Sequence, residues 1–305
     1  MRMSSVPPLT TDNPPAVECV GLIAGWGDYP LVVARKLKLL GYRVIGVGIR
    51  GHADAELAEL CDAYTTVNPA RGGKGIRFFK RHNVKYVMMA GKVQKLILFR
   101  KFAWLRLIPD LTTLKMFYNH FVARNSDTRD DAFLLAFVAM FQRQGLTVVP
   151  ATYFAPELLV KPGNLTENTI TASQQRDIDF GWELAKCMGG LDVGQTVVVK
   201  DRAVLAVEAI EGTDCCIARA GDLCPQGGFT VVKVAKPQQD SRFDVPTVGI
   251  GTLESIVKAG GRCLAVEAGH TIIIDEPAVL QYAKDHNLIF VAVAGEDLIP
   301  QREAA

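Results

Sequence analysis

Runs of apolar and β-branched residues alternate with segments of helical periodicity through the first half of the chain. The expected strands cover 17–25, 42–49, 63–67, 86–91 and 146–152, and the expected helices cover 29–41, 53–61, 75–83 and 130–145. Alternation of this kind is typical of βαβ units. It predicts an N-terminal Rossmann-like domain over 17–156, built on a doubly wound parallel sheet whose ligands bind at the carboxyl ends of the strands.

A second α/β mixture follows a segment at 159–171 that is rich in Pro, Gly, Asn and Thr and has no periodicity. Expected there are helices at 177–190, 253–261 and 276–287, a hairpin over 195–210 turning at Lys200 and Asp201, and strands at 229–235, 263–268, 271–275 and 288–294. We therefore expect a linker over 157–171 and a C-terminal mixed α/β domain over 172–305. A length of 305 residues also favours two domains.

The composition, with 49% hydrophobic and 22% charged residues, is that of an ordinary globular protein. No segment reaches the roughly 20 uncharged apolar residues that a membrane span needs. Residues 1–16 hold Pro, Ser and Thr but no apolar middle of a signal peptide, so we expect a disordered extension and a cytoplasmic protein. Seven cysteines without a CxxC pair and five scattered histidines argue against a disulfide framework, a zinc centre and a histidine-rich two-metal site.

The net charge is only +2, but the charges are unevenly distributed. No acid lies between Asp62 and Asp110, and this stretch carries Arg71, Lys74, Arg77, Lys80, Arg81, Lys85, Lys92, Lys95, Arg100, Lys101 and Arg106. Of the 34 Lys and Arg, 23 remain to face 32 acids elsewhere, a net charge of −9. This asymmetry indicates an anionic ligand or an anionic membrane surface. It does not indicate nucleic acid, because no recognisable nucleic-acid-binding motif accompanies it.

The segment KLILFRKFAWLRLI, at 95–108 within this basic stretch, combines Leu, Phe and Trp with bases. Such an amphipathic segment either lies in a membrane interface, lines an acyl groove or packs as a helix on its own domain.

The first loop, in GLIAGWGDYP, follows the first expected strand and opens a helix. Gly25 and Gly27 allow a sharp turn and close approach of a ligand, and a helix N-terminus favours phosphate. A dinucleotide fingerprint would have a third glycine where this chain has Pro30, and an acid where it has Arg50. The loop is therefore equally consistent with a nucleotide or phosphate site and with a plain turn.

The end of another expected strand carries the sequence MMAGKVQK. Gly91 and Lys92 lie where a doubly wound sheet presents groups to its ligand, and Lys92 is expected either to reach a phosphate or to be a surface lysine.

An acidic cluster lies in VLAVEAIEGTD, at the end of a strand in the second half. Glu208, Glu211 and Asp214 surround Gly212 and Thr213. Carboxylate and hydroxyl oxygens are ligands for hard cations, but Thr213 or Asp214 would also cap the helix that follows.

Further along, KPQQDSRFDVPTVGIGT spaces Asp240, Arg242 and Asp244 two residues apart. If the segment is extended, the three side chains share one face. That face fits Mg²⁺ and a diphosphate, with Lys236 or Arg242 holding a phosphate, and it fits a structural ion-pair ladder equally well.

Several blocks of the sequence, taken together, resemble a known family. The blocks GLIAGWGDYP, MMAGKV, DDAFLLAFV, LDVGQTVVV, VLAVEAIEGTD, KPQQDSRFDVPTVGIGT and VEAGHTIIID run in order from about residue 20 to 295. They resemble the LpxI-type UDP-2,3-diacylglucosamine pyrophosphatases of lipid A synthesis. Trp26 stands where members of that family usually have a smaller residue.

The resemblance implies a two-domain α/β hydrolase that binds its glycolipid nucleotide in the interdomain cleft. Cleavage of the diphosphate with water and Mg²⁺, or another divalent cation, would give UMP and the diacylglucosamine 1-phosphate called lipid X. The family's essential aspartate corresponds to Asp244, which we expect to bind the metal or orient the water, with Asp214 and Asp240 as further metal ligands. The expected substrate-binding residues are Gly25, Trp26, Gly27, Gly91, Lys92, Glu211, Gly212, Thr213, Lys236, Arg242 and Thr247.

Two alternatives remain open at this point. One is an NADP-linked oxidoreductase that uses Gly25, Gly27 and Arg50, and the other is a non-catalytic nucleotide-binding or lipid-binding protein. Peripheral contact with the cytoplasmic face of the inner membrane and a homodimer are also left open.

Overall fold

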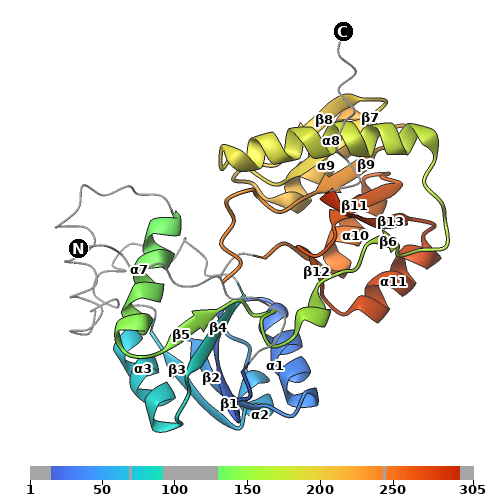
Figure 1. Cartoon of the computed structure of the whole chain (residues 1–305). Coiled ribbons are helices and arrows are strands. Elements are labelled where there is room, and N and C mark those ends of the chain that lie inside the picture. Colours follow the sequence, from blue (N-terminus) through green and yellow to red (C-terminus); the bar gives the residue numbers. More distant parts are fainter. Residues whose placement is uncertain (1–14, 69–70, 92–129, 243–244, 296–305) are drawn as a thin grey trace. The chain divides into compact units, whose positions relative to one another are not determined.

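The structure is a computed structural model that describes residues 15–68, 71–91, 130–242 and 245–295 (Figure 1). The chain divides into two compact units. One comprises Met1–Pro156 with Ser241–Phe243, and the other comprises Glu157–Asp240 with Asp244–Ala305.

The N-terminal unit is built on a five-stranded sheet in which every pair of neighbours is parallel. Its strands are β1 (Cys19–Ala24), β2 (Arg43–Ile49), β3 (Ala63–Val67), β4 (Tyr86–Ala90) and β5 (Thr147–Val149), in the order β3-β2-β1-β4-β5. Its helices are α1 (Tyr29–Leu39), α2 (Leu57–Leu60), α3 (Gly72–Arg81) and α7 (Asp130–Arg143). This strand order matches five of the six strands of a Rossmann fold, and the order reverses direction between β1 and β4.

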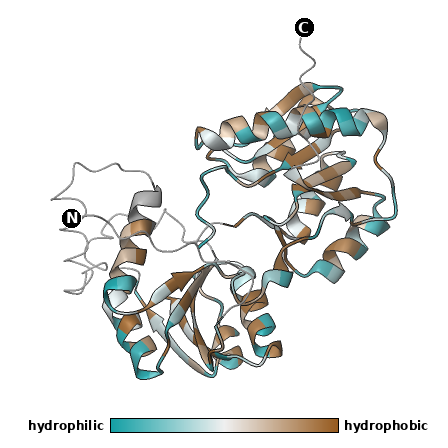
Figure 2. Ribbon diagram, viewed as in Figure 1, coloured by the Kyte–Doolittle hydropathy of each residue, from teal (hydrophilic) through white to brown (hydrophobic). Residues whose placement is uncertain are grey.

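The central strands β1 and β2 are apolar and buried along most of their length, as expected for a parallel sheet covered by helices (Figure 2). Phe79 of α3 and Phe141 of α7 pack on the same face, in one cluster with Ile23 and Ile45. Figure 1 shows α1 and α2 on the opposite side of the sheet from α3 and α7.

The C-terminal unit contains a six-stranded mixed sheet in the order β6-β13-β11-β9-β7-β8. Its strands are β6 (Gly163–Asn164), β7 (Thr196–Lys200), β8 (Ala203–Val207), β9 (Thr230–Lys233), β11 (Cys263–Glu267) and β13 (Ile289–Val293). Strands β9, β11 and β13 run parallel, while β7 is antiparallel to both β8 and β9. Strand β8 therefore runs in the same direction as β9, and both end at the same edge of the sheet.

Helices cover both faces of this second sheet. Helix α8 (Ala172–Gly190) buries Ile178 and Trp182 against one face. On the other face lie α9 (Thr213–Leu223), α10 (Ile250–Lys258) and α11 (Glu276–Asp285), which bury Ile217, Leu253 and Val279. A short parallel pair, β10 (Thr247–Val248) with β12 (Ile272–Ile273), completes the unit. The predicted two-domain α/β fold, with a doubly wound parallel sheet and a mixed sheet, is confirmed.

Three local predictions in the C-terminal half were wrong. Residues 163–164, expected in a linker, form β6 and pair with β13. The hairpin turns one residue later than expected, at Asp201 and Arg202, because both adopt positive φ angles of 51° and 62°. The extended segment expected around Asp240 and Arg242 is not a strand, since Ser241 and Arg242 lie in a turn.

No helix in the described parts of the chain is long and apolar enough to cross a membrane.

Candidate active site

A row of three polar residues crosses the second sheet at the edge where β8 and β9 end. Lys233, the last residue of β9, is the register partner of Thr196, the first residue of β7. On the other side of β7, the Glu208 N–H donates to the Thr196 carbonyl at 2.9 Å. Residues in register on neighbouring strands point to the same face, so all three side chains face α9.

The burial of this row follows from the core behind it. The next residues inward on the same face, Val231, Val198 and Ala206, belong to the apolar cluster under α9–α11. The polar row extends that cluster, and Glu208 and Lys233 are only 8% and 6% exposed. Two charged side chains are therefore held out of water, which is costly unless each has polar partners.

Thr213, the first residue of α9, connects the two buried charges. Its Oγ1 donates to Glu208 Oε1 at 3.0 Å and accepts from Lys233 Nζ at 3.2 Å. Thr213 is placed by Gly212, the N-cap, whose φ of 85° favours glycine. A side chain at Gly212 would meet nothing within 4 Å, so the start of α9 is open.

Two acceptors in the row are buried without a hydrogen-bond donor among the described residues, namely Glu208 Oε2 and Thr196 Oγ1. Buried polar atoms in native proteins nearly always have a partner, so an unpaired carboxylate oxygen is a position for a water, a ligand or an ion. The start of α9 adds further binding groups, because the glycine N-cap has no side chain to satisfy the first N–H groups. These N–H groups and the Lys233 ammonium favour an anion.

The other acids of the EGTD sequence have different surroundings. Glu211 accepts from the Ala209 N–H at 3.2 Å and pairs with Arg219 at 2.7 Å, so both of its oxygens are used within the domain. Asp214 is exposed in the first turn of α9, where a negative charge complements the helix dipole.

A partly buried ion pair holds the chain where it leaves β9. Lys186 of α8 lies 2.7 Å from Glu267 at the end of β11 and donates to the Ala235 carbonyl at 2.9 Å. The Ala235 N–H donates to Glu267 Oε2 at 2.7 Å. Both backbone groups of Ala235 are thus bound to one ion pair, which fixes the start of the loop that carries the predicted catalytic segment.

Five of the residues that follow Ala235 were predicted to take part in the site. Lys236 pairs with Asp192, with 2.5 Å between Nζ and Oδ1. Asp240 and Arg242 are both half-buried, but Asp240 belongs to the C-terminal unit and Arg242 to the N-terminal unit. Thr247 begins β10 and is half-buried. Asp244 lies outside the described residues.

The N-terminal unit brings the two predicted glycine loops together where its strand order reverses. The Gly25 N–H after β1 donates to the Ala90 carbonyl of β4 at 2.8 Å. Gly91, with φ of 87°, lies so close that an added Cβ would be 2.9 Å from the Gly25 carbonyl carbon and 3.0 Å from the Trp26 oxygen. Trp26 itself is 52% exposed. Lys92 lies outside the described residues.

The N-terminus of α1 is poorly suited to bind a phosphate. Pro30 has no N–H, and the Leu31 N–H already donates to the Asp28 carbonyl at 2.9 Å. The Asp28 carboxylate is exposed at the N-cap, where it would repel a phosphate. These features argue against a dinucleotide bound in the manner of an NADP enzyme.

Comparison with known proteins gives the same family for both units. Residues 19–158 match the model of the LpxI N-terminal domain, and residues 161–291 match that of the LpxI C-terminal domain. The chain belongs to the LpxI family. It is 30% identical over 283 residues to the UDP-2,3-diacylglucosamine pyrophosphatase LpxI of Caulobacter vibrioides, covering 90% of this chain and 97% of that protein.

Among solved structures, the biotin carboxylase domain of a single-chain bacterial carboxylase is similar with a TM-score of 0.24 and 15% identity. The similarity covers 68% of this chain and 39% of that chain. At this TM-score it supports no conclusion about fold or function.

The residues of the polar row could supply part of the ligand set of the divalent cation that the LpxI resemblance implies. In the described parts of the chain, no group of three or more His, Cys, Asp or Glu side chains could hold a metal ion. Mg²⁺ commonly takes only one or two carboxylates, with waters and substrate phosphates as its other ligands. The unpaired oxygen of Glu208 fits one such ligand.

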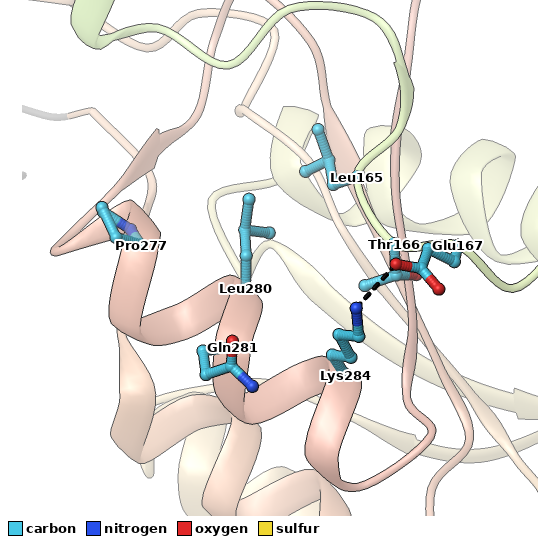
Figure 3. Close-up of a pocket in the computed structure, with 7 residues that line it drawn as sticks. All are labelled: Leu165, Thr166, Glu167, Pro277, Leu280, Gln281 and Lys284. Carbon is cyan, nitrogen blue, oxygen red and sulfur yellow. Dashed lines mark hydrogen bonds and ion pairs between the residues drawn. The ribbon is translucent and has the colours of Figure 1, made fainter.

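A cavity of about 200 Å³ lies elsewhere in the C-terminal unit (Figure 3). It is lined by Leu165, Thr166, Glu167, Pro277, Leu280, Gln281 and Lys284. Lys284 and Glu167 form an ion pair of 2.7 Å across it, and the hydrogen bond from Lys284 lowers the pKa of the Glu167 carboxyl. None of the predicted LpxI site residues lines this cavity.

The sequence analysis missed Lys233 and the Lys186–Glu267 pair. Lys233 had a visible signal, because it is a lysine within the apolar strand FTVVKVA. A charge in such a strand is buried only when it has a partner or a ligand. The Lys186–Glu267 ion pair had no visible signal in the sequence, because its two members lie 81 residues apart.

Proposed function

We propose that this chain hydrolyses the diphosphate of UDP-2,3-diacylglucosamine, giving UMP and 2,3-diacylglucosamine 1-phosphate in lipid A synthesis. The observation that carries the proposal is the agreement of both units with the LpxI domain models, together with 30% identity to a protein named for this activity. The polar row at the end of β9 supplies groups suited to a diphosphate.

In the proposed mechanism, water attacks one phosphorus and the bridging P–O bond breaks. This reaction depends on charge neutralisation and positioning more than on a covalent nucleophile. The Lys233 ammonium and the first N–H groups of α9 would bind phosphate oxygens. The Thr213 hydroxyl, held by Glu208, keeps the Lys233 ammonium in place. Lys92, Lys236 and Arg242 remain further candidates for binding phosphate oxygens.

We further propose that Asp244 and Glu208 would both hold a divalent cation, Mg²⁺ in the first instance. When bound, such a cation neutralises charge on the diphosphate and makes water a better nucleophile. Glu208 is supported by its buried, unpaired oxygen. Asp244 rests on the family motif, and Asp214 and Asp240 stay predicted ligands of lower rank.

The remaining parts of the site are proposals of the same kind. The loops around Gly25, Trp26, Gly27 and Gly91 would contact the nucleotide or the sugar, since they lie where the strand order of a Rossmann sheet reverses. Binding of the substrate between the two domains, contact with the inner membrane and a homodimer stay predictions.

The test is release of UMP from detergent-solubilised UDP-2,3-diacylglucosamine, with Mg²⁺, with other divalent metals and with a chelator. We expect UMP with metal and none with chelator. Glu208→Gln keeps the acceptor for Thr213 but removes the charge, so it should raise the metal concentration needed for half-maximal rate. Glu254→Gln, an exposed acid on α10, is the control. Absence of UMP with every metal would favour a non-catalytic nucleotide-binding or lipid-binding protein instead.

A further inference from the structure

The outer face of α3 is strongly basic. The helix buries Ile76 and Phe79 in the core of the N-terminal unit, so its other side faces solvent (Figure 2). The exposed bases on and beside it are Arg71, Lys74, Arg77, Lys80, Arg81 and Lys85. We call these six residues the α3 basic face.

Among the described residues, no ion pair joins these six bases to an acid of their own domain. From Ala63 to Pro156, no Asp or Glu belongs to the residues whose side chains the structure describes. The polar contacts found for the set go to neutral oxygens, since Lys74 donates to the Thr66 carbonyl at 2.9 Å and Lys80 to Gln144 Oε1 at 3.1 Å.

The opposite side of the same sheet is different. There three bases of α1 and β2 are paired with acids. Arg35 pairs with Glu56, Lys38 with Asp62 at 2.7 Å and Arg43 with Glu18 at 3.1 Å. Among the described residues of this unit, the α3 basic face thus has no acid partner whereas those three bases do, which is the arrangement expected of a surface that meets an anionic partner.

We propose that the α3 basic face docks on the anionic surface of a lipid bilayer. The choice of partner rests on the proposed function, because an enzyme whose substrate is a diacylated glycolipid must work at a membrane. Clusters of four to eight Lys and Arg bind anionic lipid headgroups, and six lie on this short helix and its ends. A nucleic acid is a less suitable partner, because no recognisable nucleic-acid-binding motif accompanies these basic side chains.

The experiment measures binding of the full chain to vesicles of phosphatidylcholine alone and of phosphatidylcholine with phosphatidylglycerol, by co-sedimentation. We expect binding only to the anionic vesicles, weakening as salt rises, because the Debye length falls to about 10 Å at 0.1 M. The test variant combines Arg77→Gln, Arg81→Gln and Lys85→Gln. Each base near an anionic surface changes partitioning about fivefold, so the triple variant should bind about a hundredfold more weakly.

The matched control combines Lys161→Gln, Arg176→Gln and Lys258→Gln. These are three exposed bases of the C-terminal unit, so the net charge changes equally. The control should bind vesicles as the wild type does. Equal losses in both triple variants, equal binding to neutral vesicles, or tighter binding to a random DNA duplex would each overturn the proposal.

Hydrolysis of detergent-solubilised substrate separates this proposal from the proposed function. Both triple variants should release UMP at the wild-type rate, because none of the six residues belongs to the site. A wild type that releases UMP but does not bind anionic vesicles refutes the docking surface alone. A wild type that binds vesicles through α3 but releases no UMP refutes the hydrolase and leaves the docking surface standing.

Discussion

Removing one hydroxyl tests whether Thr213 holds two buried charges in place. Thr213→Val keeps the shape of the side chain but loses the bond to Glu208 at 3.0 Å and the bond from Lys233 at 3.2 Å. Each hydrogen bond to a charged group contributes about 1.5–3 kcal/mol to stability, and structural relaxation in the variant offsets part of the loss of the two bonds. We therefore expect the free energy of unfolding of the C-terminal domain to fall by about 3 kcal/mol, which lowers its Tm by about 10 °C.

The same variant should also lose activity, because the Lys233 ammonium loses the hydroxyl that helps to orient it. Loss of one positioned electrostatic group typically lowers kcat about 100-fold or more. Thr213→Ser is the control, since it retains the hydroxyl and should keep both the Tm and most of the rate. The assays are thermal denaturation and UMP release. A Val variant as active and as stable as the Ser variant would refute the role of the hydroxyl.

Three further predictions concern other parts of the chain. Asp244→Ala should abolish UMP release while the far-ultraviolet circular dichroism and substrate binding persist; near-normal turnover would remove Asp244 from the mechanism. Gly91→Ala should destabilise the N-terminal unit by about 2 kcal/mol or more through its left-handed φ and the crowding by Gly25, seen in thermal denaturation; an unchanged Tm would contradict the tight loop packing. Burial raises the pKa of the Cys263 thiol from 9.0 to about 12, so the unfolded chain loses that proton first and stability falls as pH rises above 9. Urea denaturation at pH 8 and pH 10 gives the fall in the free energy of unfolding between these pH values. That fall should be about 1 kcal/mol smaller in Cys263→Ala than in the wild type; equal falls would contradict the burial argument.

Most of the regular elements were predictable because their signals are local. Strand β3 was expected at 63–67 and is Ala63–Val67, since a run of aromatic and β-branched residues favours extended backbone. Helix α8 begins at Ala172, five residues before the expected start. Its signal was also local, namely the capping box in which Thr171 Oγ1 accepts from the Gln174 N–H at 3.2 Å.

The polar row was only partly predictable because it depends on pairing across strands. The EGTD sequence indicated Thr213, but nothing local joins it to Lys233, which reaches it only through the register of β7 with β9. The turn at Arg242 was missed for a related reason. The alternation of charges resembled a strand, whereas the backbone turns at 237–238, where Lys236 and Gln239 bond to each other, and again at Ser241 and Arg242.

The most direct test of the proposed active site compares two lysines of the same domain. Lys233 lies in the polar row, whereas Lys200 lies at the other end of β7 and donates to the Gly227 carbonyl at 2.6 Å. In Lys233→Met, kcat for UMP release should fall about 100-fold or more, whereas in Lys200→Met it should stay near the wild-type value. Equal rates in the two folded variants would contradict the placement of the reaction at the end of β9.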